Sequence, residues 1–324
     1  MKKIFCCALI VACFMLVLPL SVMGGGKKEN AAAISTSAKT NINKVNNIPA
    51  QSDTFRLLNR DTNTVSDISA EDYIFGVVAA EMPALYESEA LKAQAVAAYT
   101  FACRRRLESG EKDYDITTDP KTDQSFAAAE ELKKRWGDKA DVYTEKIKKA
   151  VADTKDQVLT YNGEPALTVY HAVSSGMTNA CRDVWGKDLP YLKSVASPYD
   201  KLAPNYLSSV TVSGEDFCKK LAGKCTFSGS KEKYIGDIKR TDTGAVKTVC
   251  ICGKEVTGGE IRSAFDLRSL NFDITLNNGN FVFTVRGYGH GVGMSQFGAD
   301  YMAKQGSTYK EILATYYKGL SLSD

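Results

Sequence analysis

The sequence predicts an α+β protein: one globular domain, in one or two lobes, that a membrane segment anchors. Three observations favour this class. The chain opens on an uncharged apolar run, short strands with Asn-Gly turns are interspersed with amphipathic helices, and a hydrophobic share of 44% can fill a core. The net charge of the 324 residues is only +3, so charge gives no argument for a nucleic-acid partner.

Two lysines precede the apolar run, which extends from Ile4 to Met23. A bilayer takes about 20 apolar residues to cross, and the end of this run matches a signal-peptidase site poorly. We therefore expect residues 1–25 to form a signal-anchor helix, with a cleaved signal peptide as the alternative. The lysines favour a cytoplasmic N-terminus, which predicts a single-pass membrane protein whose folded part lies outside the cytoplasm.

Residues 26–52 are rich in Gly, Ser, Asn and Lys and poor in large apolar side chains. Such a composition buries too little surface to order a chain, so we predict a disordered tether. The folded domain is then expected over 53–324, beginning with a short strand at Phe55 in FRLLN.

Capping residues predict where the first helices begin. Ser69 is suited to cap a helix from Ala70 to about Met82, because Asp72 follows it as in a capping box, and a proline then ends the helix. Ser88 is suited to cap a second, alanine-rich helix from Glu89 to about Arg106. Lysine-rich helices are expected around 127–136 and 143–153.

Two Asn-Gly pairs predict β-hairpins, because this dipeptide favours the tightest hairpin turn. One hairpin would pair 157–161 with 166–170 and the other would pair 272–276 with 281–286. Two helices near 296–304 and 308–317 are expected to follow the second hairpin, and Thr308 with Glu311 would form a capping box for the last helix.

Six cysteines lie beyond the apolar run. Cys218 and Cys225 are the more plausible local disulfide, whereas Cys250 and Cys252 are two apart on a strand, which makes a bridge awkward. Unpaired core cysteines are the equal alternative.

Glu81 has the most suggestive chemistry. On the first predicted helix it lies on or beside the apolar face, in the last turn, where the helix dipole disfavours an anion. Both effects raise a carboxyl pKa, as a general acid near neutral pH requires. An ordinary solvated glutamate at a helix end is the alternative.

Two further segments are candidate binding loops. His171 ends a strand before a Ser/Gly loop, and glycines alternate through 286–296 between a strand and a helix. Alternating glycines suit a backbone that a ligand or another strand approaches closely, and the spacing fits neither a dinucleotide nor a phosphate fingerprint.

Long blocks of the sequence resemble the stage II sporulation protein D family, which also includes the amidase enhancers. The resemblance runs in order from about 55 to 320. Its blocks are EDYIFGVVAAEMP (71–83), ALKAQAVAAYTFA (90–102), YHAVSSGMTNACRDVWG (170–186), PYLKSVASPYD (190–200) and GYGHGVGMSQFGADYMAKQG (287–306).

This resemblance implies a lytic transglycosylase that cuts peptidoglycan glycan strands between N-acetylmuramic acid and N-acetylglucosamine during forespore engulfment. It implies Glu81 as the catalytic acid and the stage II sporulation proteins P and M as partners at the cell membrane. A non-catalytic, membrane-tethered activator of a cell-wall amidase is the alternative. Candidate substrate-binding residues are Gln124, His171, Ser174, Ser175, Thr178, Tyr288, His290, Ser295 and Gln296.

Some relatives hold zinc with a Cys and a His-Cys pair. Thr117, Thr122 and Asp123 stand at the matching positions here. Threonine is a poor zinc ligand, so we expect no metal and no other cofactor.

Overall fold

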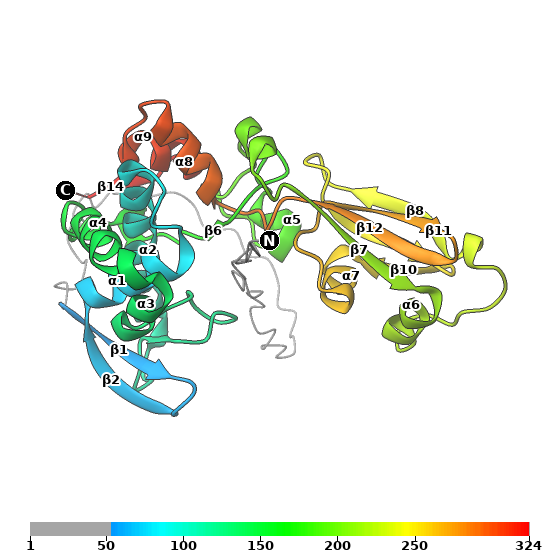
Figure 1. Ribbon diagram of the computed structural model, residues 1–324, viewed down its shortest axis with the longest axis horizontal. Coiled ribbons are helices and arrows are strands. Elements are labelled where there is room, and N and C mark those ends of the chain that lie inside the picture. The colour runs from blue at the N-terminus through cyan, green and yellow to red at the C-terminus, as the bar shows by residue number, and fades with distance from the viewer. Residues whose placement is uncertain (1–52, 324) are drawn as a thin grey trace, which may run out of the picture.

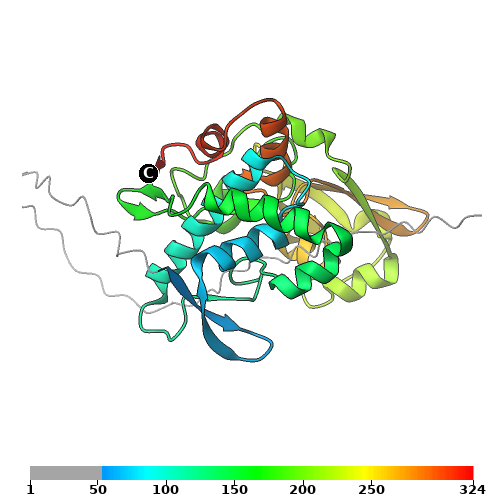
Figure 2. The same cartoon turned by 60° about the vertical axis from the view of Figure 1, so that its left-hand side comes forward.

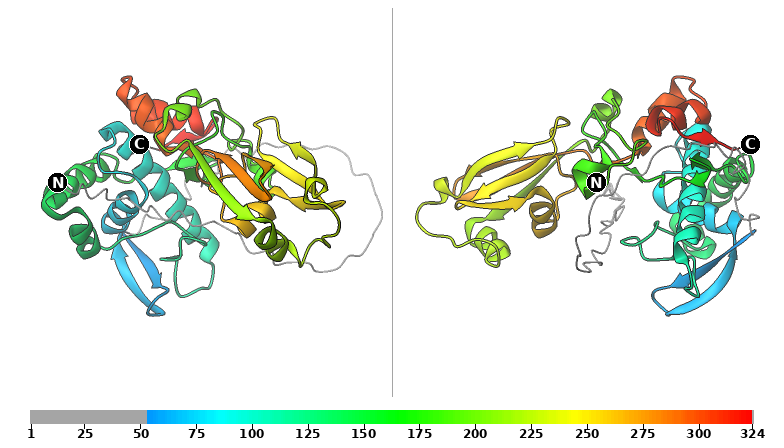
Figure 3. Two further views of the ribbon diagram at one scale, coloured as in Figure 1. Left: turned by 45° about the vertical axis from the view of Figure 1, so that its right-hand side comes forward. Right: turned by 180° about the vertical axis from the view of Figure 1, so that it is seen from behind.

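The computed structural model describes residues 53–323, which form two lobes with separate hydrophobic cores. Figure 1 shows a helical lobe on the left and a sheet lobe on the right. Views from the side and from behind keep the two lobes apart, with the segment that includes α5 (Cys181–Trp185) between them (Figure 3). The α+β class is confirmed. No helix within 53–323 is long and apolar enough to cross a membrane. The predicted anchor (1–25) and tether (26–52) lie outside the described residues.

The helical lobe is built around α2, which is buried along most of its length. Its alanines let neighbouring helices approach closely, and α1, α4, α8 and α9 all pack against it. The helices of this lobe are α1 (Ala70–Glu81), α2 (Ser88–Ser109), α3 (Ala129–Trp136), α4 (Ala140–Ala152), α8 (Gln296–Lys304) and α9 (Tyr309–Tyr316).

Two of the three predicted N-terminal caps, Ser69 and Thr308, are confirmed. The Ser69 hydroxyl accepts a hydrogen bond from the Asp72 N–H, and Thr308 with Glu311 forms a complete capping box for α9. The second helix differs from the prediction, since it already includes Ser88 and its N-cap is Glu87, which makes no capping bond through its side chain. The Glu87 N–H instead donates to the buried Asp300 carboxylate at 2.8 Å, so a tertiary contact fixes this end.

A small sheet closes one end of the helical lobe. β1 (Thr54–Asn59) pairs antiparallel with β2 (Thr64–Ser69) and parallel with β3 (Ile116–Thr117). The predicted strand at Phe55 is therefore confirmed. The hairpin projects from the lower edge of the lobe in Figure 2 and leads directly into α1.

The first Asn-Gly hairpin is shorter than predicted. β4 (Leu159–Tyr161) pairs with β5 (Glu164–Pro165) over two residue pairs, and β14 (Ser321–Leu322) covers its other edge. Pro165 has no N–H to extend the ladder. The chain then leaves the hairpin, and β6 (Tyr170–His171) pairs with β13 (Met294–Ser295) instead.

The sheet lobe contains the second Asn-Gly hairpin as predicted, with Asn278 and Gly279 both at positive φ. The lobe consists of two three-stranded sheets, with strand orders β11-β12-β7 and β10-β9-β8, and of helices α6 and α7, which share one hydrophobic core with the sheets. The elements are β7 (Leu207–Ser213), α6 (Gly214–Leu221), β8 (Ile235–Arg240), β9 (Val246–Ile251), β10 (Lys254–Thr257), α7 (Gly258–Phe265), β11 (Phe272–Asn277) and β12 (Asn280–Arg286).

The cysteines of 53–323 are free thiols. Cys218 and Cys225 therefore form no disulfide, and the alternative of unpaired cysteines describes them.

Candidate active site

Glu81 is the last residue of α1, and its side chain is partly buried. Its Oε1 accepts a hydrogen bond from the Ser125 backbone N–H at 2.8 Å. Burial raises the pKa of Glu81, while hydrogen bonds from the Ser125 N–H and hydroxyl and from the Gln296 amide lower it, and burial prevails. None of the ion pairs among residues 53–323 includes Glu81. A protonatable carboxyl with neutral partners is what the site provides.

Gln296 comes to Glu81 from the opposite end of the chain, at the first turn of α8. Its amide Nε2 also donates to the Gln94 Oε1 on α2 at 3.4 Å. Gln94 is fully buried, and its own Nε2 has no hydrogen-bond partner. Three helices, α1, α2 and α8, therefore contribute polar groups around the carboxyl.

Gln124 is buried beside this group. Its Nε2 donates to the Tyr73 hydroxyl and the Ala98 carbonyl, and its Oε1 accepts from the Tyr170 hydroxyl at 2.8 Å. The amide is thus fully engaged within the protein, whereas Tyr170 is partly exposed.

His171 points away from this group, because adjacent side chains of a strand lie on opposite faces. Its Nδ1 donates to the Val292 carbonyl at 3.1 Å, which leaves Nε2 as a buried acceptor without a hydrogen-bond partner. Burial lowers the pKa of His171 to about 4. The His290 ring lies 5.8 Å from the His171 ring and 4.8 Å from the Trp185 ring, and burial lowers its pKa as well.

The alternating glycines lie where the 287–295 segment runs against the 169–179 segment. A Cβ at Gly293 would be 1.9 Å from the Val169 carbonyl oxygen, and one at Gly289 would be 2.8 Å from the His171 Cβ. Both glycines have positive φ, as do Gly287 and Gly291. The alternating glycines predict the close approach of either a ligand or another strand, and the structure shows the approach of another backbone segment.

Asp200 ties several predicted site residues into the framework. Its buried carboxylate accepts from the Ser174 N–H through Oδ2 at 2.7 Å, whereas its Oδ1 has no hydrogen-bond partner. The neighbouring hydroxyls of Ser174, Ser295 and Ser197 lower its pKa. The Ser295 hydroxyl also caps α8. Burial raises the pKa of Asp200. Ser174 and Ser295 are themselves buried.

The other predicted binding residues lie near the junction of the lobes. The buried Thr178 hydroxyl accepts from the Val195 N–H at 2.9 Å. The Ser175 hydroxyl lies 3.4 Å from the Thr243 carbonyl of the sheet lobe, and the Tyr288 ring lies beneath the Arg268 guanidinium at 4.7 Å. Both of these side chains are partly exposed.

The positions that match the zinc ligands of some relatives are occupied by hydrogen-bonded residues. Asp123 binds Arg105 and the Thr117 N–H with its two carboxylate oxygens. The Thr122 hydroxyl donates to Asp119, and the Thr117 hydroxyl accepts from the Asp119 N–H. Two hydroxyls and one engaged carboxylate do not fit a zinc ion.

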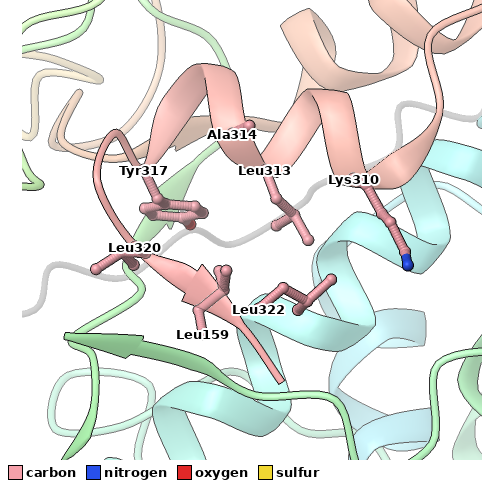
Figure 4. Close-up of a pocket in the computed structure, with 7 residues that line it drawn as sticks. All are labelled: Leu159, Lys310, Leu313, Ala314, Tyr317, Leu320 and Leu322. Atoms are coloured by element: carbon pink, nitrogen blue, oxygen red, sulfur yellow. The ribbon is translucent and has the colours of Figure 1, made fainter. Parts of the chain in front are cut away.

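A pocket elsewhere in the helical lobe is apolar and contains no acid. Figure 4 shows its lining between α9, β14 and β4: Leu159, Lys310, Leu313, Ala314, Tyr317, Leu320 and Leu322. Glu81 is not among the residues that line this pocket, so the pocket and the carboxyl are separate features.

Sequence reasoning missed Ser125, Tyr170, Gln94 and Asp200. Ser125 lies 44 positions from Glu81 in a loop without periodicity, and no local pattern predicts that contact. Tyr170 had a signal, since strand alternation places it on the face opposite to His171.

Comparison with known proteins agrees with the sequence blocks. A family model described as Stage II sporulation protein matches residues 59–161. The Stage II sporulation protein D of Bacillus subtilis (strain 168) is 35% identical, over 99% of this chain and 94% of its own length. The Stage II sporulation protein D of Bacillus amyloliquefaciens is 39% identical over 81% of this chain and 76% of its own length. The Amidase enhancer of Bacillus subtilis (strain 168) is 28% identical over 76% of this chain and 40% of its own length.

Proposed function

The chain belongs to the stage II sporulation protein D family, and from that premise we propose that it is a lytic transglycosylase acting on peptidoglycan. It would cleave glycan strands between N-acetylmuramic acid and N-acetylglucosamine and leave a 1,6-anhydro end. Glu81 is the proposed general acid. The observation that carries the proposal is a partly buried carboxyl without an ionic partner, whose pKa burial raises.

A single carboxyl suffices for this reaction. Glycoside hydrolases of the common kind need a second carboxylate, as nucleophile or to activate water. Here Glu81 would give its proton to the glycosidic oxygen as that bond breaks. The resulting carboxylate would take the proton of the muramic acid 6-hydroxyl, whose oxygen then bonds to C1, so no water is consumed.

The hydrogen-bond donors around Glu81 suit this exchange of roles. Ser125 and Gln296 stabilise the carboxylate that forms after the first proton transfer, yet neither carries a charge that would hold Glu81 ionised beforehand. Ser125 bonds Glu81, and Tyr170 bonds the adjacent residue Gln124. Both Ser125 and Tyr170 are partly exposed, so a sugar could touch them.

Asp200 is not proposed as a second catalytic carboxyl. It is fully buried, and its Oδ2 already accepts from the Ser174 N–H. A carboxyl that no substrate atom can reach cannot attack a sugar or activate water, so Asp200 is assigned to holding the loops.

The proposed setting follows from the family and from the apolar run. We propose that residues 4–23 anchor the chain in the cell membrane, with the catalytic domain outside the cytoplasm between the mother cell and forespore membranes. Proteins P and M of the same sporulation stage are the proposed partners.

Activation of a cell-wall amidase is the second candidate function. It is favoured by the similarity to a protein named amidase enhancer. The two functions are compatible in one chain, because an enhancer needs to bind the wall and a partner but does not need Glu81.

The first experiment is product analysis with the full chain, purified in mild detergent and incubated with peptide-stripped glycan strands. Mass spectrometry should find 1,6-anhydro ends; reducing ends would identify a hydrolase instead. Glu81→Gln should lose about 100-fold or more of the activity, since general acid–base catalysis contributes about 10²–10⁴-fold.

The matched control is Glu71→Gln, which makes the same change at an exposed position of the same helix. It should keep wild-type activity. A folded Glu81→Gln protein with the wild-type rate of anhydro product would refute the catalytic assignment. If that variant loses turnover but still stimulates an amidase, both functions are present.

A further inference from the structure

A buried ion pair joins α2 to the loop that reaches Glu81. The Arg105 Nε lies 2.6 Å from the Asp123 Oδ1, and the Asp123 side chain is only 1% exposed. The other oxygen, Oδ2, accepts from the Thr117 backbone N–H at 2.8 Å. Asp123 therefore both pairs with a cation and closes its own loop, and we call Arg105 and Asp123 the clasp.

Asp123 of the clasp lies two positions before Ser125, the residue that bonds the Glu81 carboxyl. Gln124 follows Asp123 and accepts from the Tyr170 hydroxyl, and Ser125 comes next and donates to Glu81. Ser125 is thus only two positions after Asp123, so a shift of Asp123 also moves the Ser125 N–H.

Beyond Ser125 the loop is held by apolar contacts instead. The Phe126 ring stacks on Tyr73 with centroids 5.7 Å apart, and it lies against Gly76, where a Cβ would be 2.4 Å away. The Ala127 N–H donates to the Gly76 carbonyl at 3.3 Å. Ser125 is therefore fixed between a polar anchor and an aromatic anchor, and both anchors rest on helices of the same core.

We infer that the clasp is a positioning device for catalysis: Arg105 and Asp123 hold Ser125 where it bonds the Glu81 carboxyl. Neither clasp residue touches the substrate or the reacting atoms. The inference rests on the proposed role of Glu81, and it adds two residues that act through Ser125.

The clasp has a measurable effect on the acid. Hydrogen bonds from Ser125 lower the pKa of Glu81 against the larger effect of burial, so loosening Ser125 lets that pKa rise further. The other group that bonds the carboxyl is Gln296, and the titratable neighbour that responds to its charge is Tyr73. Among charged groups near α1, Lys148 of α4 lies over Phe75, and Arg105 is engaged with Asp123.

The test compares Asp123→Asn and Arg105→Lys with the wild-type full chain in detergent. Removing one partner of a buried ion pair can unfold a protein, so both variants stay close to the original residue in size. Asp123→Asn offers one acceptor oxygen to two donors, and Arg105→Lys keeps the positive charge without the guanidinium N–H groups. We expect kcat on glycan strands to fall about tenfold or more with KM nearly unchanged, because a misplacement near 1 Å costs about 100-fold. The high-pH limb of the rate profile should move to higher pH, since Glu81 stays protonated longer.

Arg104→Gln is the matched control. Arg104 is the adjacent arginine of α2. It pairs with the exposed Glu164, shares the exposed Glu108 with Arg105, and forms no ion pair with Asp123. It should leave kcat and the pH profile at wild-type values. Ser125→Ala removes the hydroxyl that bonds Glu81 but keeps the backbone N–H. Added to Asp123→Asn, it should change kcat by less than the product of the two single effects, because the shifted loop has already weakened the hydroxyl bond.

A carboxyl-carbon NMR titration of Glu81 gives a readout that needs no substrate, with Glu81→Gln used to assign the signal. A higher Glu81 pKa in folded Asp123→Asn supports the clasp even if the wild type cleaves no glycan, which would refute only the proposed function. An unchanged Glu81 pKa together with an unchanged kcat in the folded variants overturns the clasp.

Discussion

Glu81 and His171 are titratable residues that burial shifts in opposite directions. The pKa of Glu81 is raised and that of His171 is lowered to about 4, and in both cases burial favours the uncharged form. His171 is consequently neutral at physiological pH and has no proton to give. Its Nδ1–H donates a hydrogen bond to the Val292 carbonyl, and this bond links β6 to the glycine segment.

This assignment of His171 predicts how stability depends on pH. Unfolded His171 has an ordinary pKa near 6.5, so the unfolded state gains the proton first as the pH falls. The stability that neutral His171 contributes is complete above about pH 6.5 and is lost progressively towards pH 4. The difference of about 2.5 pKa units corresponds to roughly 3 kcal/mol of unfolding free energy.

Denaturant unfolding between pH 7 and pH 4 checks it against His171→Asn, whose amide can still donate to Val292. The variant should start less stable and lose less on acidification than the wild type. Equal losses in the two proteins would show that His171 is not held neutral.

The decisive element is the pair of segments formed by β6, β13 and the alternating glycines. The 287–295 segment pairs with the 169–179 segment and then delivers Gln296 to Glu81 at the start of α8. Positive φ at every second residue and missing Cβ atoms allow the two backbones to lie this close. The glycines therefore act on the site through packing.

Two glycine substitutions separate the close approach from the backbone conformation. Gly293→Ala and Gly163→Ala both place a side chain at positive φ, which costs about 1–2 kcal/mol. Only Gly293 has a neighbour, the Val169 carbonyl, whereas a Cβ at Gly163 meets nothing within 4 Å. We expect Gly293→Ala to lose roughly 1–3 kcal/mol more in thermal unfolding. Equal losses would mean that backbone conformation alone requires the glycine.

Local chemistry predicted elements better than it predicted the site. The Ser69 and Thr308 caps and the second Asn-Gly hairpin depend on neighbours in sequence, and they are as expected. The start of α2 and the partner of β6 depend on Asp300 and β13, which are more than 100 residues away. The contact between Ser125 and Glu81 also joins residues that are far apart in the sequence, so no local sequence pattern could have predicted it.

At the scale of the molecule, the two lobes are stabilised by different means. The helical lobe buries many alanines of α2 among aliphatic and aromatic side chains, whereas phenylalanines make up a larger share of the sheet-lobe core. Phe217 is at the centre of these phenylalanines, 3.9 Å from the Phe281 ring and 5.2 Å from the Phe265 ring. Separate cores need not unfold together.

Calorimetry should therefore resolve two unfolding transitions, and one core substitution in each lobe assigns them. Phe217→Ala should cost its lobe about 3–5 kcal/mol, and Leu91→Ala of α2 should cost about 2–5 kcal/mol. Both side chains are fully buried. Each variant should lower one transition and leave the other in place. A parallel shift of a single transition in both variants would show that the lobes unfold as one unit.

The strand pairing at the base of the sheet lobe brings its two ends together. β7 and β12 are neighbours, Leu207 pairs with Arg286, and the Gly287 N–H donates to the Tyr206 carbonyl at 2.8 Å. The chain thus departs from the rest of the protein and returns to it at a single point. Because its two ends lie side by side, a segment of this kind can be lengthened, shortened or exchanged in a single evolutionary event without changing the path of the chain on either side. Descendants of one ancestor could in this way keep the Glu81 region while differing freely in the lobe that they carry beside it.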